Sequence, residues 1–405
     1  MEIEMKKVVI VEACRTAVGS MGGSLKPLSA EDLAVSVMKG ILDRSGIDPK
    51  EIDQVYMGQC RQSSDSSNVA RVAALRAGIP EESPAATVMC ACASGMMATF
   101  NGMASIQTGN ADVVLTGGTE SMSNAIFYLS NARYGVGTGD ARLKDSLTEA
   151  QFCSQPQDIY GHFNMGMTAD NVAEKYHISR EDQDAFSLSS QLKAAKAIAE
   201  GKFKEEIIPV TVPQGKKKEP IIFDTDEFPR ETSMEKLAKL KPCFKPETGT
   251  VTAGSSSGRN DGASALLLMS EEKAEELGLK PLAYIRSIAS AGVDPRYMGL
   301  GPVPATKKAL KLAELTLDDI QLIELNEAFA AQSLGCIREL GLENRMDDIN
   351  VNGGAIALGH PIGSSGSRII VTLLYEMRRR HLRYGLATLC IAGGMGMATI
   401  LEIPQ

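Results

Sequence analysis

Residues 87–98 carry the residue types of a reactive thiol. A β-branched pair leads into Cys90 and Cys92, and Ser94, Gly95 and helix-favouring residues follow. This order predicts a strand, a tight turn and a helix, with Cys92 on or just before the first helical turn. Unpaired amides and the positive end of the helix dipole would lower the pKa of a thiol there. Because an isolated cysteine is more often a small buried hydrophobe, other residues must decide between the two interpretations.

A histidine in a glycine-rich turn is the natural partner for such a thiol. His360 lies between Gly359 and Pro361, just before the stretch 363–366 and a predicted helix. Proline restricts the histidine to extended backbone, and the glycines allow a ligand or another backbone segment to approach. A lone histidine is more often structural, but a rigid turn offers few packing reasons for one. A thiol beside an imidazole is an activated nucleophile, and acyl transfer is its natural use.

Two more polar side chains lie at the ends of predicted strands. Cys390 ends a strand just before a glycine loop, and Asn326 follows the strand 320–325. Strand ends are where α/β sheets gather ligands. The plainer interpretations are core packing for Cys390 and a helix N-cap for Asn326. Four such sites, all in turns at strand ends, make coincidence a weaker explanation than a shared active site.

The composition excludes several classes of function. The net charge of −8 argues against nucleic acid as a bulk partner. The eight cysteines lack the spacing of a disulfide framework, so we expect free thiols in a reducing, cytoplasmic compartment. Four histidines and a C-x-C pair argue against a metal site. Residues 1–7 are charged and no run of about 18 apolar residues occurs, so no signal peptide or membrane span is expected.

Strand and helix patterns alternate along most of the 405 residues, which predicts an α/β protein of two or three packed units with a mainly parallel sheet. We expect strands over 7–11, 55–58, 111–115, 320–325 and 386–391, and helices over 29–45, 70–77, 306–315, 328–340 and 369–380. Gly117-Gly118 should break the strand that precedes it. Between about 121 and 248 only the helix 180–200 is convincing, and Lys216-Lys217-Lys218 falls in a loop, so this stretch is predicted to be a large insertion.

From about Val9 to Leu401 the chain resembles the thiolases, and among them the acetyl-CoA acetyltransferases most. The matching motifs, in the family's order, are Arg15-Thr16, Cys92-Ala93-Ser94-Gly95, Gly117-Gly118-Thr119-Glu120-Ser121-Met122-Ser123, the stretch 165–173, the stretch 249–254, Asn326-Glu327-Ala328-Phe329, Gly359-His360-Pro361 and Cys390. The resemblance implies a five-layered αβαβα fold of two similar halves plus a loop domain. The halves would be 1–121 with 249–271, and 272–405. The loop domain 122–248 would bind coenzyme A (CoA) and contribute contacts in a homotetramer, a dimer of dimers.

The resemblance also implies catalytic roles. Cys92 would be the nucleophile that acetyl-CoA or a 3-ketoacyl-CoA acylates, and His360 would take its proton. Cys390 would be the acid/base for the carbon–carbon bond. Developing enolate charge would be held by His360 and by a water on Asn326, and the tetrahedral intermediate by the backbone N–H groups of Cys92 and Ala392. The reaction would be the reversible condensation of two acetyl-CoA to acetoacetyl-CoA and CoA, with CoA as substrate or product and no permanently bound cofactor.

Substrate contacts are carried over in the same way. Arg230 would contact the adenine end of CoA and Ser257 the pantetheine, while the acyl pocket would be lined by Met165, Phe244, Met298 and Phe329. Each of these apolar residues could equally belong to the core.

Several positions depart from the family pattern. Met89 replaces an asparagine, Ala392 a glycine and Asn164 a histidine, with His162 nearby, and residues 151–157 form a longer stretch than usual. Because the last two changes touch the acyl pocket, a degradative 3-ketoacyl-CoA thiolase of broader chain length is the nearest alternative. A ketoacyl synthase or hydroxymethylglutaryl-CoA synthase is disfavoured by Cys390 in its glycine loop. A non-catalytic acyl-CoA-binding subunit is disfavoured by the intact cysteines and histidine.

Overall fold

The computed structural model describes residues 5–215 and 218–404, so Lys216 and Lys217 of the predicted loop lie outside the described residues. The strands are β1 (Val8–Thr16), β2 (Gly19–Ser20), β3 (Gln54–Gly58), β4 (Ala85–Val88), β5 (Val113–Ser121), β6 (Phe127–Tyr128), β7 (Lys144–Asp145), β8 (Ile207–Ile208), β9 (Val210–Val212), β10 (Ile221–Phe223), β11 (Asn260–Ser270), β12 (Ala283–Gly292), β13 (Leu322–Leu325), β14 (Tyr384–Ile391) and β15 (Met395–Glu402). The α-helices are α1 (Ala30–Ser45), α2 (Val69–Ala77), α3 (Ser94–Gln107), α4 (Ser146–Phe152), α5 (Gln157–Tyr160), α6 (Met165–Lys175), α7 (Arg180–Ala199), α8 (Met234–Ala238), α9 (Glu271–Glu276), α10 (Pro302–Ala313), α11 (Ala330–Leu340), α12 (Ala355–Leu358) and α13 (Ile362–Arg380). None of the helices described is long and apolar enough to cross a membrane.

The main strands follow the order β13-β14-β15-β12-β1-β11-β5-β3-β4. The two halves of this path meet only through β1 and β12, which share the register pairs Val9↔Tyr284 and Ile10↔Ala283. Neighbours β3-β4, β3-β5 and β13-β14 are parallel, whereas the other neighbours along the path are antiparallel. The prediction of a mainly parallel sheet is therefore wrong, because β11, β12 and β15 run against their neighbours.

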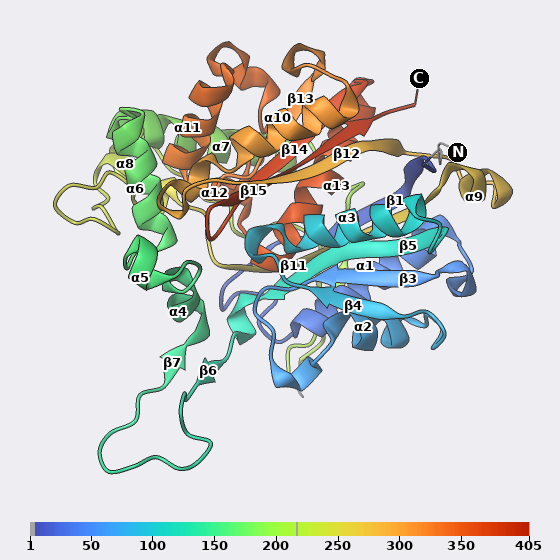
Figure 1. Cartoon of the computed structure of the whole chain (residues 1–405), viewed down its shortest axis with the longest axis horizontal. Helices are drawn as coiled ribbons and strands as arrows, with labels where there is room; N and C mark the ends of the chain where they lie inside the picture. Colours follow the sequence, from blue (N-terminus) through green and yellow to red (C-terminus); the bar gives the residue numbers. More distant parts are fainter. Residues whose placement is uncertain (1–4, 216–217, 405) are drawn as a thin grey trace.

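The helices and the two halves of the sheet path stack in five layers (Figure 1). Helices α1 and α2 cover one outer face, and α10 packs on the other outer face against β12 and β15. Helices α3 and α13 lie in the middle, where α13 contacts β5 and β11 of one half and β13 and β14 of the other. The αβαβα architecture that the resemblance implies is confirmed.

Strand β5 does not break at Gly117-Gly118, contrary to the prediction. A Cβ on Gly117 would lie 2.1 Å from the carbonyl oxygen of Ser264, and a Cβ on Gly118 would lie 2.1 Å from that of Gly363. The two glycines therefore serve close backbone approach within the strand. Gly118 lets β5 touch the start of α13, which begins two residues after His360.

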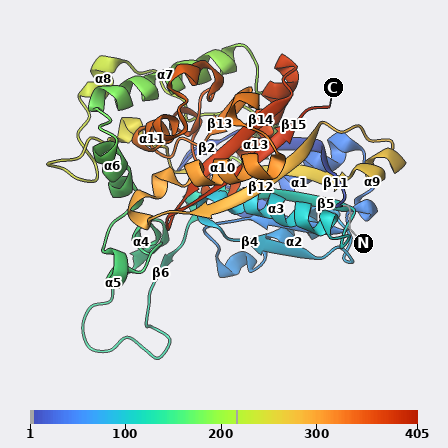
Figure 2. The ribbon, with the colours of Figure 1, turned by 45° about the horizontal axis from the view of Figure 1, so that its top comes forward.

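The segment between β5 and β11 holds more structure than the sequence indicates. Its predicted helix is α7, and Ser179 and Asp182 form the capping box at its start. Helices α4, α5, α6 and α8 were not predicted. A loop between β6 and β7 projects from the body of the molecule (Figures 1 and 2). The segment is anchored on β1 by Arg15, whose guanidinium pairs with Glu206 and Asp226 in the interior.

Candidate active site

The structure brings the predicted reactive residues to one cavity of about 240 Å³. Its lining includes Cys92 from the turn before α3, His360 from the turn between α12 and α13, and Cys390 and Ala392 from the end of β14. These three regions come from both halves of the sheet path, and α13 and α3 hold them together in the middle layer. Cys92 and Cys390 follow strands β4 and β14 as the strand-end argument predicts, whereas His360 comes from a turn between two helices and Asn326 is not in the lining.

Cys92 sits in a short 3₁₀ turn that leads directly into α3, as predicted. The side chain of Ser94 accepts the backbone N–H of Cys90 at 2.9 Å and donates to the carbonyl of Ala91 at 2.7 Å, which fixes the turn. Ala91 has a left-handed φ of +44°, a strained value for a residue with a side chain. Cys92 lines the cavity whereas Cys90 does not, which separates the two neighbouring thiols.

The structure contradicts the predicted lowering of the Cys92 pKa. Burial raises the pKa of the Cys92 thiol to about 11, although the backbone N–H groups of Ala392 and of Cys92 itself and the charge of Arg61 act in the opposite direction. Desolvation of a charged sulfur therefore outweighs the amides at the helix start. The same two N–H groups are the ones that the resemblance assigns to the oxyanion.

His360 is held as a neutral base. Its backbone N–H donates to Oδ1 of Asn260 at 2.9 Å, and its Nδ1 lies 2.6 Å from Oγ of Ser365. Because that hydroxyl donates its hydrogen to the carbonyl of Pro361, it accepts from Nδ1–H. Nε2 is then the unprotonated nitrogen, and it is buried without a hydrogen-bond partner among the described residues. Burial and the nearby charge of Arg368 lower the pKa of His360 to about 3.

Cys390 and Asn326 are both buried, and they differ in their access to the cavity. Burial and the neighbouring Cys92 raise the pKa of Cys390 well above its ordinary value, so it is a thiol at rest. Asn326 does not line the cavity, and neither polar atom of its side chain has a hydrogen-bond partner within the described part of the chain. It is not a helix N-cap either, because α11 begins at Ala330 with Phe329 at the cap position.

The proposed acyl-pocket residues line the same cavity, namely Met165, Phe244, Met298 and Phe329. The rings of Phe244 and Phe329 meet edge to face with centroids 5.9 Å apart. Ser257 also lines the cavity, and its backbone N–H donates to the carbonyl of Ala328 at 3.0 Å. Arg230 lies outside the lining on an exposed loop, where its guanidinium stacks 5.2 Å from the ring of Phe228.

The departures from the family pattern find local explanations. Asn164 is the N-cap of α6, where its side chain accepts the backbone N–H of Met167 at 3.0 Å. His162 stacks on Phe152 with ring centroids 4.6 Å apart and does not line the cavity. Met89 is 65% exposed, so its side chain replaces no interior contact.

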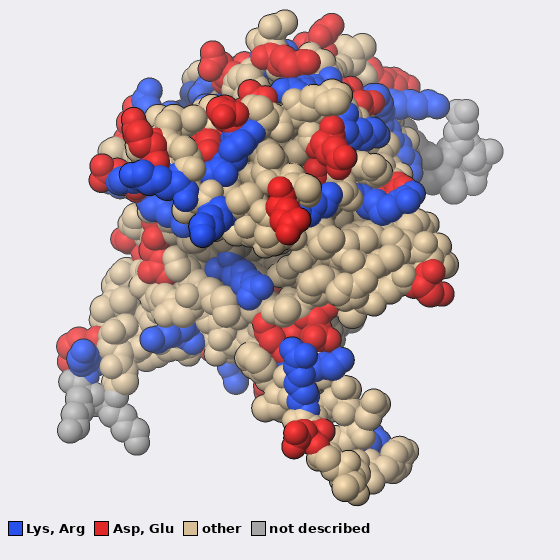
Figure 3. Space-filling view, turned by 90° about the vertical axis from the view of Figure 1, so that its left-hand side faces the viewer, with Lys and Arg blue, Asp and Glu red and all other residues tan. Residues whose placement is uncertain are grey.

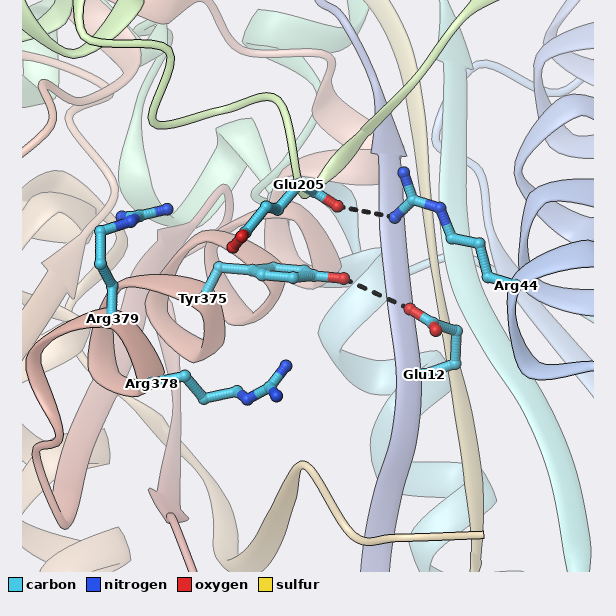
Figure 4. Close-up of a pocket in the computed structure, with 6 residues that line it drawn as sticks. All are labelled: Glu12, Arg44, Glu205, Tyr375, Arg378 and Arg379. Atoms are coloured by element: carbon cyan, nitrogen blue, oxygen red, sulfur yellow. Dashed lines mark hydrogen bonds between the residues drawn. The ribbon is translucent and has the colours of Figure 1, made fainter.

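Several lining residues were missed by sequence reasoning, namely Met122, Gln151, Ser256, Gly258, Arg259, Ala328 and Ile362. Ser256, Gly258, Ala328 and Ile362 adjoin predicted positions, so chain proximity was an available signal. For Gln151 the signal was the longer stretch 151–157, which was expected to touch the acyl pocket without any one residue being singled out. Another cavity opens beside β1 and the end of α13, where Arg44 donates to the carbonyl of Glu205 and Tyr375 to Glu12 (Figure 4). It contains no thiol or imidazole, so it offers no acyl-transfer chemistry.

No group of three or more His, Cys, Asp and Glu residues that could hold a metal ion occurs within 5–215 and 218–404. The cavity itself combines two thiols, an unprotonated imidazole nitrogen and backbone N–H groups with an apolar wall. Such an arrangement can attack a thioester, hold the negative oxygen that forms and move a proton to or from carbon.

Comparisons with known proteins agree with this chemistry. The model of the thiolase N-terminal domain matches residues 8–272, and that of the thiolase C-terminal domain matches residues 279–403. Acetyl-CoA acetyltransferases of Syntrophomonas wolfei and Pseudomonas aeruginosa are each 51% identical, over 98% of this chain and 99% of theirs. The crystal structure of the Bacillus anthracis acetyl-CoA acetyltransferase aligns with a TM-score of 0.95 at 43% identity, covering all of both chains. Human mitochondrial 3-ketoacyl-CoA thiolase aligns with a TM-score of 0.93, also at 43% identity, over 99% of each chain.

Proposed function

The chain belongs to the thiolase family, and from that membership we propose that it is an acetyl-CoA acetyltransferase, which joins two acetyl-CoA molecules reversibly into acetoacetyl-CoA and CoA. The observation that carries the proposal is the single cavity lined by Cys92, His360 and Cys390. Relatives that match this chain over almost its whole length at about 50% identity are named acetyl-CoA acetyltransferase, which favours this activity among those of the family.

In the acylation half, the sulfur of Cys92 attacks the thioester carbonyl of acetyl-CoA while its proton passes to Nε2 of His360. The carbonyl oxygen becomes negative and is held by the N–H groups of Cys92 and Ala392, which already face the sulfur. The carbon–sulfur bond to CoA then breaks. Cys390, a thiol at rest, gives its proton to the departing CoA sulfur and becomes a thiolate.

In the condensation half, the Cys390 thiolate removes a proton from the methyl group of a second acetyl-CoA. The resulting enolate forms a carbon–carbon bond with the acyl carbon on Cys92, and the bond from that carbon to sulfur breaks. The proton held on His360 returns to Cys92, so both thiols and the imidazole recover their starting states. His360 and a water held by the unpartnered amide of Asn326 stabilise the enolate oxygen.

The remaining substrate contacts follow the same assignment. Arg230 meets the adenine end of CoA, Ser257 meets the pantetheine, and Met165, Phe244, Met298 and Phe329 form the acyl pocket. Basic side chains lie in a hollow near the middle of the face that Figure 3 shows, which suits an anionic substrate. CoA enters and leaves as substrate and product, with no permanently bound cofactor.

We also propose that the enzyme is a cytoplasmic homotetramer. Each subunit would consist of one half formed by residues 1–121 with 249–271, a second half formed by residues 272–405, and a loop domain formed by residues 122–248. The support for assembly is the loop between β6 and β7, which projects from the body and is largely uncharged (Figures 1 and 3). Phe127 is 65%, Tyr134 98% and Leu143 64% exposed on this segment. Large apolar side chains at such exposure favour contact with another subunit.

A degradative 3-ketoacyl-CoA thiolase of broader chain length is the second candidate, because human mitochondrial 3-ketoacyl-CoA thiolase has the same fold at 43% identity. Thiolysis rates with CoA and 3-ketoacyl-CoA substrates of four, six, eight and twelve carbons separate the two. A sharp fall beyond four carbons supports the acetyl-CoA acetyltransferase. A flat or rising profile supports the degradative enzyme, and no cleavage of any substrate would contradict both and favour an acyl-CoA-binding subunit.

A further inference from the structure

The wall of the active-site cavity contains one amide side chain, that of Gln151 on α4. The same lining includes the apolar side chains of Met122, Met165, Phe244, Met298 and Phe329, and the polar ones of Ser256, Ser257 and Arg259. The amide of Gln151 has no hydrogen-bond partner among the residues that the structure describes, and the residue is only partly buried. A group of this kind keeps its hydrogen bonds only while water or a polar ligand reaches it.

The backbone around Gln151 is fixed in place. Nε2 of Gln155 donates to the carbonyl of Phe163 at 3.2 Å, and Nε2 of Gln157 donates to that of Phe152 at 3.1 Å. The carbonyl of Ser154 approaches Gly393 so closely that a Cβ there would lie 2.7 Å from it. Since Gly393 follows Ala392, the segment that presents Gln151 packs directly on the loop after Cys390. The backbone that carries Gln151 is therefore held against the wall of the site rather than on a free loop.

Only one residue of the altered stretch 151–164 faces the cavity. Asn164 caps α6, and His162 stacks on Phe152 away from the lining. Gln151 is therefore the residue of this stretch through which it can contact an acyl group directly. Resting on the proposed thiolase activity, we propose that Gln151 sets the acyl-chain preference: its unpaired amide is a polar patch that disfavours alkyl chains long enough to cover it.

The physical reason is desolvation. A short acetoacetyl group leaves the amide hydrated, whereas a longer alkyl chain displaces the water and offers neither a donor nor an acceptor. An amide left unpaired in an apolar site is costly, and sites with such groups reject apolar analogues strongly. The amide thus favours short acyl groups without a steric block, so the preference depends on polarity more than on volume.

The test compares Gln151→Met, which removes the amide at nearly the same length, with Gln151→Asn, which keeps the amide and removes a methylene. Gln151→Leu is a second apolar variant, and Glu149→Gln, on the same helix and outside the lining, is the matched control. For each enzyme, kcat/KM in thiolysis is measured with four-carbon and eight-carbon 3-ketoacyl-CoA, and KM for CoA is measured with both.

We expect the ratio of kcat/KM for eight over four carbons to rise about tenfold in Gln151→Met and Gln151→Leu, which corresponds to about 1.4 kcal/mol. The ratio should stay near the wild-type value in Gln151→Asn and Glu149→Gln. If this ratio rises in Gln151→Asn alone, or in all three Gln151 variants, the size of the side chain and not its polarity limits the acyl chain. Either result would overturn the proposal. An unchanged ratio with a raised KM for CoA at both lengths would mean that the amide serves pantetheine, which also overturns it.

The two proposals fail in different ways. If wild-type enzyme cleaves eight carbons as well as four and the ratio still rises in the apolar variants, the acetyl-CoA preference is wrong while the role of Gln151 stands. If wild-type enzyme prefers four carbons and the apolar variants keep that preference, the role of Gln151 is wrong while the proposed function stands.

Discussion

Replacing Arg15 with methionine should destabilise the protein more than any exposed charge deletion. The Arg15 side chain is 1% exposed, its Nε donates to Glu206 at 2.5 Å, and its two terminal nitrogens donate to the two oxygens of Asp226 at 2.7 and 2.9 Å. Methionine fills much of the volume but leaves Glu206 and Asp226 buried without their cation. Because these two residues belong to the segment between β5 and β11, the pairing also anchors that segment on β1.

The expected loss is about 4 kcal/mol, since removing one partner of a buried ion pair typically costs about 3–5 kcal/mol. Burial already raises the pKa of Glu206 while Arg15 lowers it. Without Arg15 the folded-state pKa of Glu206 rises further above its unfolded value. A carboxyl group with a raised folded-state pKa is destabilising above that pKa and is relieved by protonation below it. The loss of unfolding free energy in Arg15→Met should therefore reach its whole value at pH 8 and be smaller at pH 5.

Urea unfolding followed by circular dichroism at pH 8 and pH 5, for wild type and Arg15→Met, measures both effects. Arg296→Met is the matched control, because Arg296 pairs with Asp294 at 2.6 Å but the two side chains are 56% and 35% exposed. Such a surface pair is worth about 0–1 kcal/mol. A loss in Arg15→Met no larger than in the control would refute a stabilising role for the buried network. A loss of the same size at both pH values would refute the unpaired carboxylate as its cause.

Two further predictions concern the site. Cys92→Ser should form no acyl-enzyme with acetyl-CoA by mass spectrometry, whereas Cys390→Ala should be acylated but make no acetoacetyl-CoA; labelling of the first or condensation by the second would contradict the assigned roles. Gly118→Ala should lower both activity and the unfolding midpoint, because its Cβ would lie 2.1 Å from the carbonyl of Gly363 next to the catalytic turn. Gly137→Ala, with nothing within 4 Å of its Cβ, should change neither, and equal behaviour of the two variants would rule out the steric argument.

The catalytic turns were predictable because their information is local. A cysteine before a helix start, a histidine between glycine and proline and a cysteine before a glycine loop each define their turn within a few residues. The start of the predicted helix 29–45 is local in the same way, because Ser29 and Asp32 form a capping box there. The convergence of Cys92 and Cys390 needed one more assumption, that strand ends of an α/β sheet gather at one place, whereas His360 joins them from the turn between α12 and α13.

Strand direction was not predictable from local patterns. Strand β15 pairs antiparallel with β14 after Gly393 and Gly394, whose φ values of +92° and +84° let the chain reverse. The sequence pattern predicts a strand over 386–391 that ends before a glycine loop, and it predicts no strand after that loop. In β5, by contrast, Gly117 lies within the strand. Its lack of a side chain allows close approach of the backbone of Ser264, which lies 147 positions later in the chain. Whether a glycine ends a strand or admits a neighbour depends on contacts that the sequence pattern does not contain.

The pKa of the nucleophile is decided by a balance of local and global effects. The amides at the start of α3 are visible in the sequence and favour a thiolate, whereas burial depends on the whole fold and raises the pKa of Cys92 to about 11. Burial likewise lowers the pKa of His360 to about 3. The resting pair is therefore an uncharged thiol and an uncharged imidazole, which a buried site accommodates at little cost. Charge then separates only as the substrate carbonyl becomes an oxyanion, at the point where the N–H groups of Cys92 and Ala392 can hold it.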